Sequence, residues 1–572
     1  MNSSPHPEAV CNRSMATERP DSQYNSQDLV RATIARLSLF LQFEKKILAI
    51  LAAYALAIGV FALIVPLTVQ ELVNTFAYAL QPIMVVTLVS VMAIALLVMG
   101  SFRVLQARAV EILVQRLYAR IALGLTQQLP RFSEVGFTPK YANYFMEAEL
   151  LPRSLAAMLV DILNVTVGGA IGMTILVMYH PYFIIFNVLL VGGFVTIITI
   201  LGRGGLKITM DVSRHNYATM NWIQNIATNL LHFKATASTP FLMKKTDELV
   251  HAYVAARKIR SDILTGTQYK GSVIWQAFGH SGLIATAGWL LAIGQITLGQ
   301  FVAAEVIVGT LIINLDTVSK RMYYVYYAFT SLYELENLFA LPKDKEHGKL
   351  SVPLPDPTLH GVRLTCKDVS FSYPNSPPTF QHFNVEVAPG EKVAIFSATS
   401  TGKTTLARVL AGLYSPTSGV IRYNGVDLRD LGMDSLNACR GLILDSQLTL
   451  FESTLEENLT MGRPVHYDDI RWALRFVELE EEVDAMPLGL QSPVKSGGKG
   501  FTTSQTLRLL VARAIVARPQ ILILDGTLHS MQPALRDTLL RRLCSKEEPW
   551  SVIFVSNDPT LSTHVDRRVL LE

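Results

Sequence analysis

The chain has 572 residues, of which 50% are hydrophobic and 17% are charged, and its formal net charge is +4. That length exceeds what one hydrophobic core serves, so at least two domains are expected, and a charged fraction below the roughly 25% of ordinary globular proteins indicates a membrane protein. So small a net charge excludes a strongly basic chain, and we expect no nucleic-acid partner.

We expect no cleavable secretion signal at the N-terminus, because residues 1–28 are polar and lack an apolar core. We expect these residues to form a disordered tail. In the following stretch, "DLVRATIARLSLFLQF", the apolar residues share one helical face and the two arginines lie off it. This pattern fits a helix at the membrane surface and, equally, an ordinary helix packed on protein.

Six hydrophobic runs are long enough to cross a hydrocarbon core of roughly 30 Å, which takes about 20 helical residues. They lie at 47–68, 83–102, 155–179, 182–202, 272–294 and 301–319. The links after the first, third and fifth runs contain no Lys or Arg, whereas the long links after the second and fourth carry seven and ten. The positive-inside rule therefore predicts that both termini and both long links, which are rich in helix formers, face the cytosol.

Polar residues inside a membrane span are costly and often functional. Here they are Asp161, Asn164, His280, Glu305, Asn314 and Asp316. The two aspartates lie near cytosolic span ends, where contact with water is the favoured interpretation. His280 and Glu305 lie deeper, and two interpretations stay open for them: they line a substrate cavity, or they pair between helices.

The composition changes after residue 341. A Pro- and Lys-rich linker, 342–360, is expected to separate a transmembrane domain at 29–341 from a second domain at 361–572. In the second domain "RLTCKDVSFSY" and "FNVEVAPGEKVAIFS" are predicted strands, and the latter leads into "SATSTGKTTLARVLAGL". A buried strand, a tight loop and "GKTT" at the start of an amphipathic helix are the context of a phosphate-binding loop.

In such a loop, backbone N–H groups surround phosphates, a lysine reaches the terminal phosphates and a hydroxyl binds magnesium. Lys403 and Thr404 fit the last two roles, and Asp525, at the end of the apolar strand "QILILD", is the expected second partner of magnesium. One position departs from the pattern G-x-x-x-x-G-K-[ST], because Ser397 stands at its first Gly.

Together with these motifs, the six apolar runs make the chain from about residue 30 to 572 resemble an ABC transporter half-subunit of the type I exporter class. The resemblance implies a six-helix transmembrane domain followed by an α/β P-loop nucleotide-binding domain. Further matching stretches are "FSYP", whose Tyr373 would stack on adenine, "LYSPTSGVIRYNGVDLRDL", "LFESTLEENL" and "VARAIVARPQILILD". It implies ATP and Mg²⁺ as ligands, bound by Ser397, Ala398, Thr399, Ser400, Thr401, Gly402, Lys403, Thr404 and Thr405.

The family signature, Leu-Ser-Gly-Gly-Gln, runs without gaps into the magnesium aspartate. Counting back from Asp525 assigns it to "FTTSQ", so its nucleotide contacts fall on Thr502, Thr503, Ser504 and Gln505. The conspicuous "SGG" at 496–498 lies too early in the chain to be this signature.

The resemblance also implies that several functional residues are replaced. They are Ser397 and Ser400 for phosphate-loop glycines, Ser446 for the loop glutamine, Gly526 for the catalytic glutamate, Gln532 for the interface aspartate and Asn557 for the switch histidine. Gly526 offers no carboxylate and Asn557 does not titrate as His would, so hydrolysis is expected to be impaired or absent. A Cβ at 397 and 400, where Gly allows positive φ and close approach to phosphate, is expected to weaken ATP binding.

Two functions are open. In the first, the chain is a degenerate exporter half-subunit that moves a substrate, by analogy a peptide or protein, out of the cytosol with a competent second half-subunit. In the second, it is a non-catalytic membrane scaffold in a secretion or regulatory assembly. A heterodimer is favoured over a homodimer, and a periplasmic adaptor of type I secretion is a further expected partner. The expected location is the bacterial cytoplasmic (inner) membrane, with the nucleotide-binding domain in the cytosol.

Overall fold

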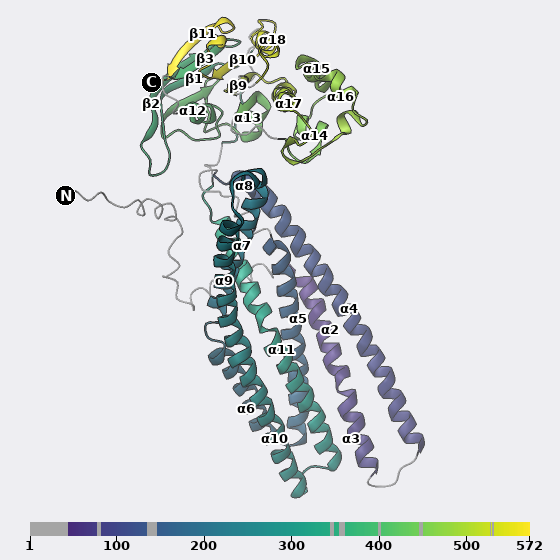
Figure 1. Cartoon of the computed structure of the whole chain (residues 1–572). Coiled ribbons are helices and arrows are strands. Elements are labelled where there is room, and N and C mark those ends of the chain that lie inside the picture. Colours follow the sequence, from purple (N-terminus) through teal and green to yellow (C-terminus); the bar gives the residue numbers. More distant parts are fainter. Residues whose placement is uncertain are drawn as a thin grey trace, which may run out of the picture. The chain divides into compact units, whose positions relative to one another are not determined.

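A computed structural model describes residues 44–76, 82–133, 143, 146–343, 348–353, 361–397, 402–444, 450–526, 528 and 531–571. The chain divides into two compact units, Met1–Pro342 and Lys343–Glu572, which are drawn together in Figure 1. The stretch 28–43, for which a surface helix was one interpretation, lies outside the described residues.

The first unit is built from long helices, which Figure 1 shows running side by side. They are α2 Lys45–Ala62, α3 Ile64–Phe76, α4 Pro82–Gln128, α5 Glu147–Tyr179, α6 Phe183–Thr196, α7 Gly205–Thr228, α8 Leu230–Thr236, α9 Thr239–Ser261, α10 Lys270–Ala292 and α11 Leu298–Phe339. The two longest, α4 and α11, have 47 and 42 residues, which is about 70 and about 63 Å of helix. Both exceed the thickness of a hydrocarbon core. The long link after the second run is helical where α4 extends into it, and the long link after the fourth run is helical in α7, α8 and α9. The prediction that the long links are helical is therefore confirmed for the residues described.

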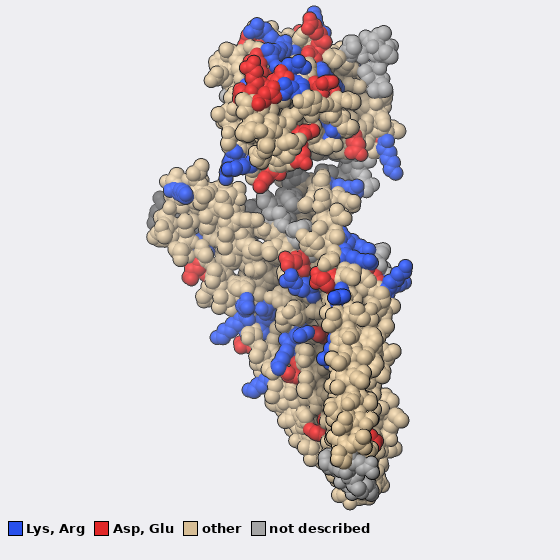
Figure 2. All heavy atoms as spheres, turned by 90° about the vertical axis from the view of Figure 1, so that its right-hand side faces the viewer, with Lys and Arg blue, Asp and Glu red and all other residues tan. Residues whose placement is uncertain are grey.

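Five segments of the described chain are long and apolar enough to cross a membrane. They are Lys45–Thr75, Pro82–Arg131, Glu149–Tyr179, Phe183–Leu201 and Leu298–Phe339. Figure 2 shows long stretches of this unit's surface without a charged side chain, as contact with lipid requires. These segments contain four of the six expected spans in full and a fifth, 182–202, except for its first and last residues. The other, 272–294, coincides with α10, whose 23 residues reach about 35 Å but include Gln276 and His280 and are too polar to join the five.

The polar side chains of α10 contact protein in this unit. The Gln276 amide donates to Asp316 Oδ1 on α11 over 2.8 Å, and the Trp275 indole N–H donates to the backbone carbonyl of Leu190 on α6 over 3.1 Å. On the same helix, buried apolar side chains such as Leu283 join a cluster shared with α5, α6 and α11. Composition alone therefore understates how well α10 suits a protein interior or a membrane.

The second unit contains a parallel sheet of five strands, in the order β11-β3-β10-β9-β6, and an antiparallel sheet of four, in the order β2-β1-β4-β5. The strands are β1 Leu364–Ser372, β2 Pro378–Val387, β3 Lys392–Ser397, β4 Ser418–Tyr423, β5 Val426–Asp427, β6 Arg440–Leu444, β7 Ser453–Thr454, β8 Pro493–Val494, β9 Ile521–Asp525, β10 Ser551–Val555 and β11 Arg567–Leu571. Because β3, β10 and β9 are parallel neighbours, the residues at their carboxyl ends gather at one edge of the sheet.

One predicted strand is wrong in its extent. The stretch 383–397 is the end of β2 and the whole of β3, separated by a turn at residues 388–391. Gly390 has a φ of +76° in this turn, a conformation that glycine adopts without steric cost. The two strands belong to different sheets, so the turn carries the chain from one sheet to the other.

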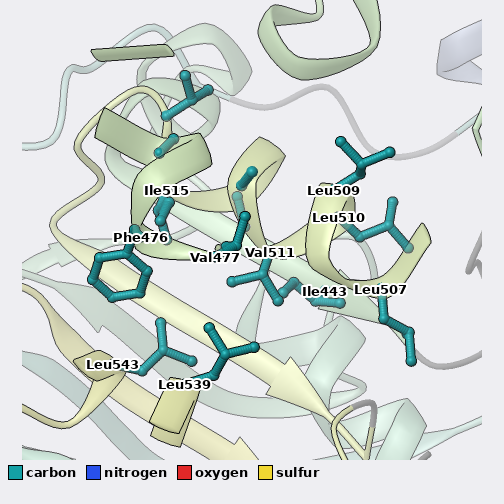
Figure 3. Close-up of a cluster of buried hydrophobic side chains, with 14 of the residues drawn as sticks. Ile443, Phe476, Val477, Leu507, Leu509, Leu510, Val511, Ile515, Leu539 and Leu543 are labelled. Atoms are coloured by element: carbon teal, nitrogen blue, oxygen red, sulfur yellow. The ribbon is translucent and has the colours of Figure 1, made fainter. Parts of the chain in front are cut away.

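The described helices of the second unit pack against the parallel sheet or against one another. They are α12 Lys403–Leu410, α13 Met433–Cys439, α14 Leu455–Thr460, α15 Tyr467–Phe476, α16 Glu480–Asp484, α17 Thr503–Ile515 and α18 Pro533–Leu543. Nine of the 13 residues of α17 are buried, and Figure 3 shows its apolar side chains beside those of β6, α15 and α18. This packing fixes α17 in place and leaves only its first turn at the surface.

Candidate nucleotide-binding site

A cavity of about 480 Å³ lies at the carboxyl edge of the parallel sheet. It is lined by Lys403, Thr404, Asp525, Gly526, Arg536, Val555, Ser556, Asn557, Asp558 and Pro559. These residues come from the start of α12, the ends of β9 and β10, the segment after β10, and α18. A volume of this size is within the range of small-molecule sites, and a helix N-terminus at its wall suits an anionic ligand.

The first turn of α12 presents the two residues expected to contact phosphate and magnesium. Gly402 precedes the helix with a φ of +91°, and a Cβ there would lie 3.3 Å from the carbonyl oxygen of Thr379. No described side chain caps this helix, and the N-terminus of a helix attracts anions. The loop residues Ala398, Thr399, Ser400 and Thr401 lie outside the described residues, as does Ser446.

Asp525 ends β9 and is 4% exposed. It lines the same cavity as Thr404, so a carboxylate and a hydroxyl meet there. Oxygen atoms of these two kinds, together with phosphate oxygens, are the ligands that magnesium prefers in proteins. The residues present therefore fit a magnesium-bound phosphate group. Lys403 lines the same cavity, and its ammonium group would contact the phosphates.

The position after Asp525 supplies no acid. Gly526 has a φ of +60°, and its N–H donates to the carbonyl of Val555 over 3.1 Å. The second carboxylate of the cavity, Asp558, forms an ion pair with Arg536 at 3.2 Å. This ion pair was not predicted, because it joins residues 22 positions apart and no sequence motif marks it.

Asn557 is held by a hydrogen bond of its own. Its Oδ1 accepts from the backbone N–H of Ser397 over 3.0 Å, which links the segment after β10 to the end of β3. Ser397 is the last residue of β3, is buried, and is not among the described residues with positive φ. The expectation that a serine at 397 disturbs a positive-φ position is therefore wrong, because the strand simply continues through this residue.

Tyr373, the expected partner of adenine, is half-buried. Its ring meets Phe371 edge-on with centroids 5.1 Å apart, and its hydroxyl lies 3.0 Å from Thr405 Oγ1 in the first turn of α12. No sequence motif predicts this bond. It fastens the aromatic residue to the helix that carries Lys403 and Thr404.

The first turn of α17 is closed by its own side chains. Thr502 Oγ1 accepts from the N–H of Gln505 over 3.2 Å, and Gln505 Oε1 accepts from the N–H of Thr502 over 2.8 Å. This reciprocal capping box satisfies two N–H groups within the chain. Thr503 and Ser504 are the first two residues of the helix.

A carboxylate on α16 holds this turn from the side. Glu482 accepts from the Gln505 amide over 2.7 Å and from the Arg508 guanidinium over 2.8 Å. Burial by itself would raise the pKa of Glu482, but these two hydrogen bonds outweigh it and hold the pKa below the ordinary value of 4.5. Gln505 is thus engaged at both ends of its side-chain amide.

The conspicuous Ser496-Gly497-Gly498 lies in a 3₁₀ turn ahead of α17. Gly497 and Gly498 have φ of +71° and +70°, and the N–H of Gly497 donates to the carbonyl of Leu450 over 3.0 Å. These glycines serve a turn that joins two loops, and they lie outside the first turn of the helix.

The two deeper polar residues of the membrane unit lie together. His280 Nδ1 on α10 is 3.1 Å from Glu305 Oε1 on α11. Both side chains are about two-fifths exposed, and Glu305 Oε2 has no hydrogen-bond partner among the described residues. The structure thus brings these residues into one pair between helices.

Comparisons with known proteins agree on both units. A family model described as "ABC transporter" matches residues 380–529. Among solved structures, a bacterial Atm1-family ABC exporter with ATP bound has a TM-score of 0.81 at 17% identity, over 92% of this chain and 93% of that one. At that identity the likeness shows the fold alone.

Curated relatives are similar over part of their length. A fatty acid ABC transporter ATP-binding/permease protein of Mycobacterium bovis is 26% identical over 442 residues, which are 74% of this chain and 67% of that protein. An ATP-dependent lipid A-core flippase of Thiobacillus denitrificans is 36% identical over 28% of each chain. A probable microcin-H47 secretion/processing ATP-binding protein of Escherichia coli is 32% identical over 36% of this chain and 29% of that one.

Proposed function

Because this chain is an ABC transporter half-subunit with an exporter-type membrane unit, we propose that it exports a substrate as the non-hydrolysing member of a pair. Half-subunits of this kind work with a second subunit, and the ABC domain is an ATP-binding domain. The observation that carries the proposal is a cavity that keeps Lys403, Thr404 and Asp525 but has Gly526 at the position of the catalytic acid.

Hydrolysis needs a group that positions water and takes up its proton as charge develops on phosphate. Gly526 has no side chain for this role. Asp558 is held by Arg536, and Asn557 is an amide already bonded to Ser397. Loss of one such group costs about 10²-fold or more in rate, so the chain hydrolyses little or no ATP.

Binding of ATP is weakened but retained in this proposal. The start of α12 lies at this cavity, and Lys403, Thr404 and Asp525 line it, which supports residual binding of phosphate and Mg²⁺. Binding of a partner's nucleotide at the signature position should also be weakened. Thr502 and Gln505 already satisfy each other's N–H groups at the helix start. A partner's nucleotide would have to displace these bonds.

The membrane unit supports location in the inner membrane, with α10 as a sixth span and both termini in the cytosol as further parts of the proposal. The names of the relatives include a fatty acid transporter, a lipid A-core flippase and a microcin secretion protein. A peptide substrate rests on the last of these alone. A periplasmic adaptor stays a prediction.

A second candidate function is a non-catalytic scaffold. The observation that favours it is that Gly526 and the altered signature at 502–504 lie in one chain. The family resemblance implies that two nucleotide-binding domains share each of two nucleotides. This chain would then contribute the altered position 526 to one shared site and the altered signature to the other. Such a pair would use ATP binding, or membrane packing alone, without turnover.

ATP turnover of the full chain, alone and with whatever half-subunit copurifies from its native cells, tests the proposal. We expect the chain alone to bind Mg-ATP, to lose that binding in Lys403→Ala, and to show the same background turnover in both forms. The paired sample should hydrolyse ATP with the phosphate-loop lysine of the partner half-subunit. Steady turnover by the chain alone that Lys403→Ala abolishes would contradict both functions, whereas a pair without turnover or nucleotide-dependent closure would support the scaffold.

A further inference from the structure

A second cavity, of about 260 Å³, lies within the membrane unit between α4, α5 and α11. Its polar lining consists of Arg103 and Gln106 from α4, Asp161 from α5 and Arg321 from α11. The remaining lining side chains are alanines and valines. The cavity is therefore charged at one part and apolar elsewhere.

The lining contains two guanidinium groups and one carboxylate. Arg321 Nη1 donates to both oxygens of Asp161, over 2.9 and 3.0 Å. Arg103 is exposed and forms no hydrogen bond or ion pair with any residue that the structure describes. Gln106 is paired with Asn164 through two amide hydrogen bonds of 2.9 and 3.1 Å. One positive charge of the lining is thus left unbalanced.

The cavity lies at the ends of the apolar runs. Arg103 directly follows the run 83–102, Arg321 lies two residues beyond 301–319, and Asp161 lies six residues inside 155–179. Lipid head groups occupy this depth in a bilayer. Met99 and Leu96 precede Arg103 by one and two helical turns and lie on the same face of α4. An apolar track therefore leads from the cavity toward the membrane interior.

We propose that this cavity binds the anionic head of an acyl-bearing amphiphile, with the acyl chain outside along α4. A guanidinium group such as that of Arg103 pairs with phosphate or carboxylate through parallel N–H donors. The volume is smaller than the roughly 300–1,000 Å³ that encloses a whole drug-sized ligand, so the cavity suits the head group of a larger molecule. This inference stands independently of whether the chain hydrolyses ATP.

The full chain in detergent, titrated with phosphatidylglycerol, phosphatidylcholine or inorganic phosphate and followed by native mass spectrometry, tests the proposal. We expect phosphatidylglycerol to bind at least about 10-fold more tightly than either of the other two, since one lacks net charge and the other lacks an acyl chain. Equal binding of phosphatidylcholine would overturn the role of the arginines. Equal binding of inorganic phosphate would overturn the role of the acyl chain.

Three variants separate this site from general attraction between basic protein and anionic lipid. Arg103→Gln should weaken phosphatidylglycerol binding about 10-fold, which is about 1.4 kcal/mol. Asp161→Asn should tighten it several-fold, because it releases Arg321 and removes the only carboxylate of the lining. Arg108→Gln, an exposed arginine on the same helix outside the cavity, is the matched control and should leave binding unchanged.

The opposite signs expected at 103 and 161 make the outcome decisive. A purely structural role would weaken binding in both variants, and a diffuse surface charge would make Arg103→Gln and Arg108→Gln alike. Either result would overturn the proposal.

Discussion

Gly526 holds a backbone conformation that few other residues tolerate. Its φ of +60° lies in the left-handed region, where a residue with a Cβ costs of order 1–3 kcal/mol. We predict that Gly526→Glu adds a carboxylate to the cavity without restoring ATP turnover, and that it lowers the free energy of unfolding of the nucleotide-binding unit by about this amount. Turnover assays and thermal unfolding of the purified full chain check both parts.

Two alanine variants serve as controls for the backbone cost. Gly526→Ala adds the Cβ without the acid, and Gly425→Ala does so at a φ of +85°, where the added Cβ would meet no heavy atom within 4 Å beyond its chain neighbours. Both alanine variants should lower the free energy of unfolding by similar amounts. If Gly526→Glu hydrolysed ATP well above the unchanged chain and kept its stability, the missing acid alone would explain the inactivity, and the left-handed backbone would be irrelevant.

The residues of the nucleotide cavity were predictable to different degrees. Lys403, Thr404 and Asp525 follow from a motif whose spacing reflects a strand, a loop and a helix start, and these three do line one cavity. The ion pair of Arg536 with Asp558 and the bond from Tyr373 to Thr405 were not predictable. Such contacts depend on how distant segments fold together, and a motif records only neighbours in sequence.

At the scale of the element, α17 offers a direct test of the capping box. We predict that Thr502→Ala destabilises the first turn by about 1 kcal/mol, the usual cost of removing a threonine cap. Exposed Thr503, the first residue of the helix, is the matched control, because Thr503→Ala leaves the cap in place. Hydrogen exchange of residues 503–508 in the full chain, followed by mass spectrometry, should accelerate only in Thr502→Ala. Equal exchange in the two variants would show that the cap does not hold this turn.

The helices, turns and strands show which structural features the sequence patterns predict and which they do not. Nine buried residues in α17 hold the helix against β6 and α18, and the stretch 501–505, to which counting back from Asp525 assigns the signature, spans the start of this helix. The glycines at 497 and 498 look like a binding motif but serve a turn with positive φ. The run 383–397 was predicted as one strand because apolar alternation resumes on both sides of the turn at Gly390, and alternation does not report a change of sheet.

At the scale of the whole molecule, α10 decides the topology. Five of the six expected spans meet a criterion of length and apolar composition, and α10 does not. Its polar groups nevertheless contact other helices, as in Gln276 with Asp316 and His280 with Glu305. A polar side chain that is satisfied by a neighbouring helix costs far less in a membrane than one that faces lipid. Hydropathy sums count both alike, which is why composition undervalues this helix.

An even number of spans places both termini on one side of the membrane, and an odd number places them on opposite sides. We predict six spans, with α10 crossing, because its 23 residues reach about 35 Å and its polar groups are paired. Reporter fusions to the full chain test this: green fluorescent protein should fluoresce at both termini, and alkaline phosphatase inserted at Gln295, between α10 and α11, should be active. The long link after α4 supplies the internal control, since phosphatase inserted there should be inactive.

The opposite topology has a distinct signature. If α10 did not cross the membrane, Gln295 would lie in the cytosol, on the same side as the segment α7 to α9. Phosphatase inserted at Gln295 would then be as inactive as phosphatase inserted in the control link after α4. The C-terminal unit would then face away from the cytosol, where ATP is available, and Lys403 and Asp525 would have no nucleotide to bind. The predicted placement of both termini on one side of the membrane and the supply of nucleotide to the cavity thus depend on the same helix, so a failure at Gln295 would undermine the nucleotide site together with the sixth span.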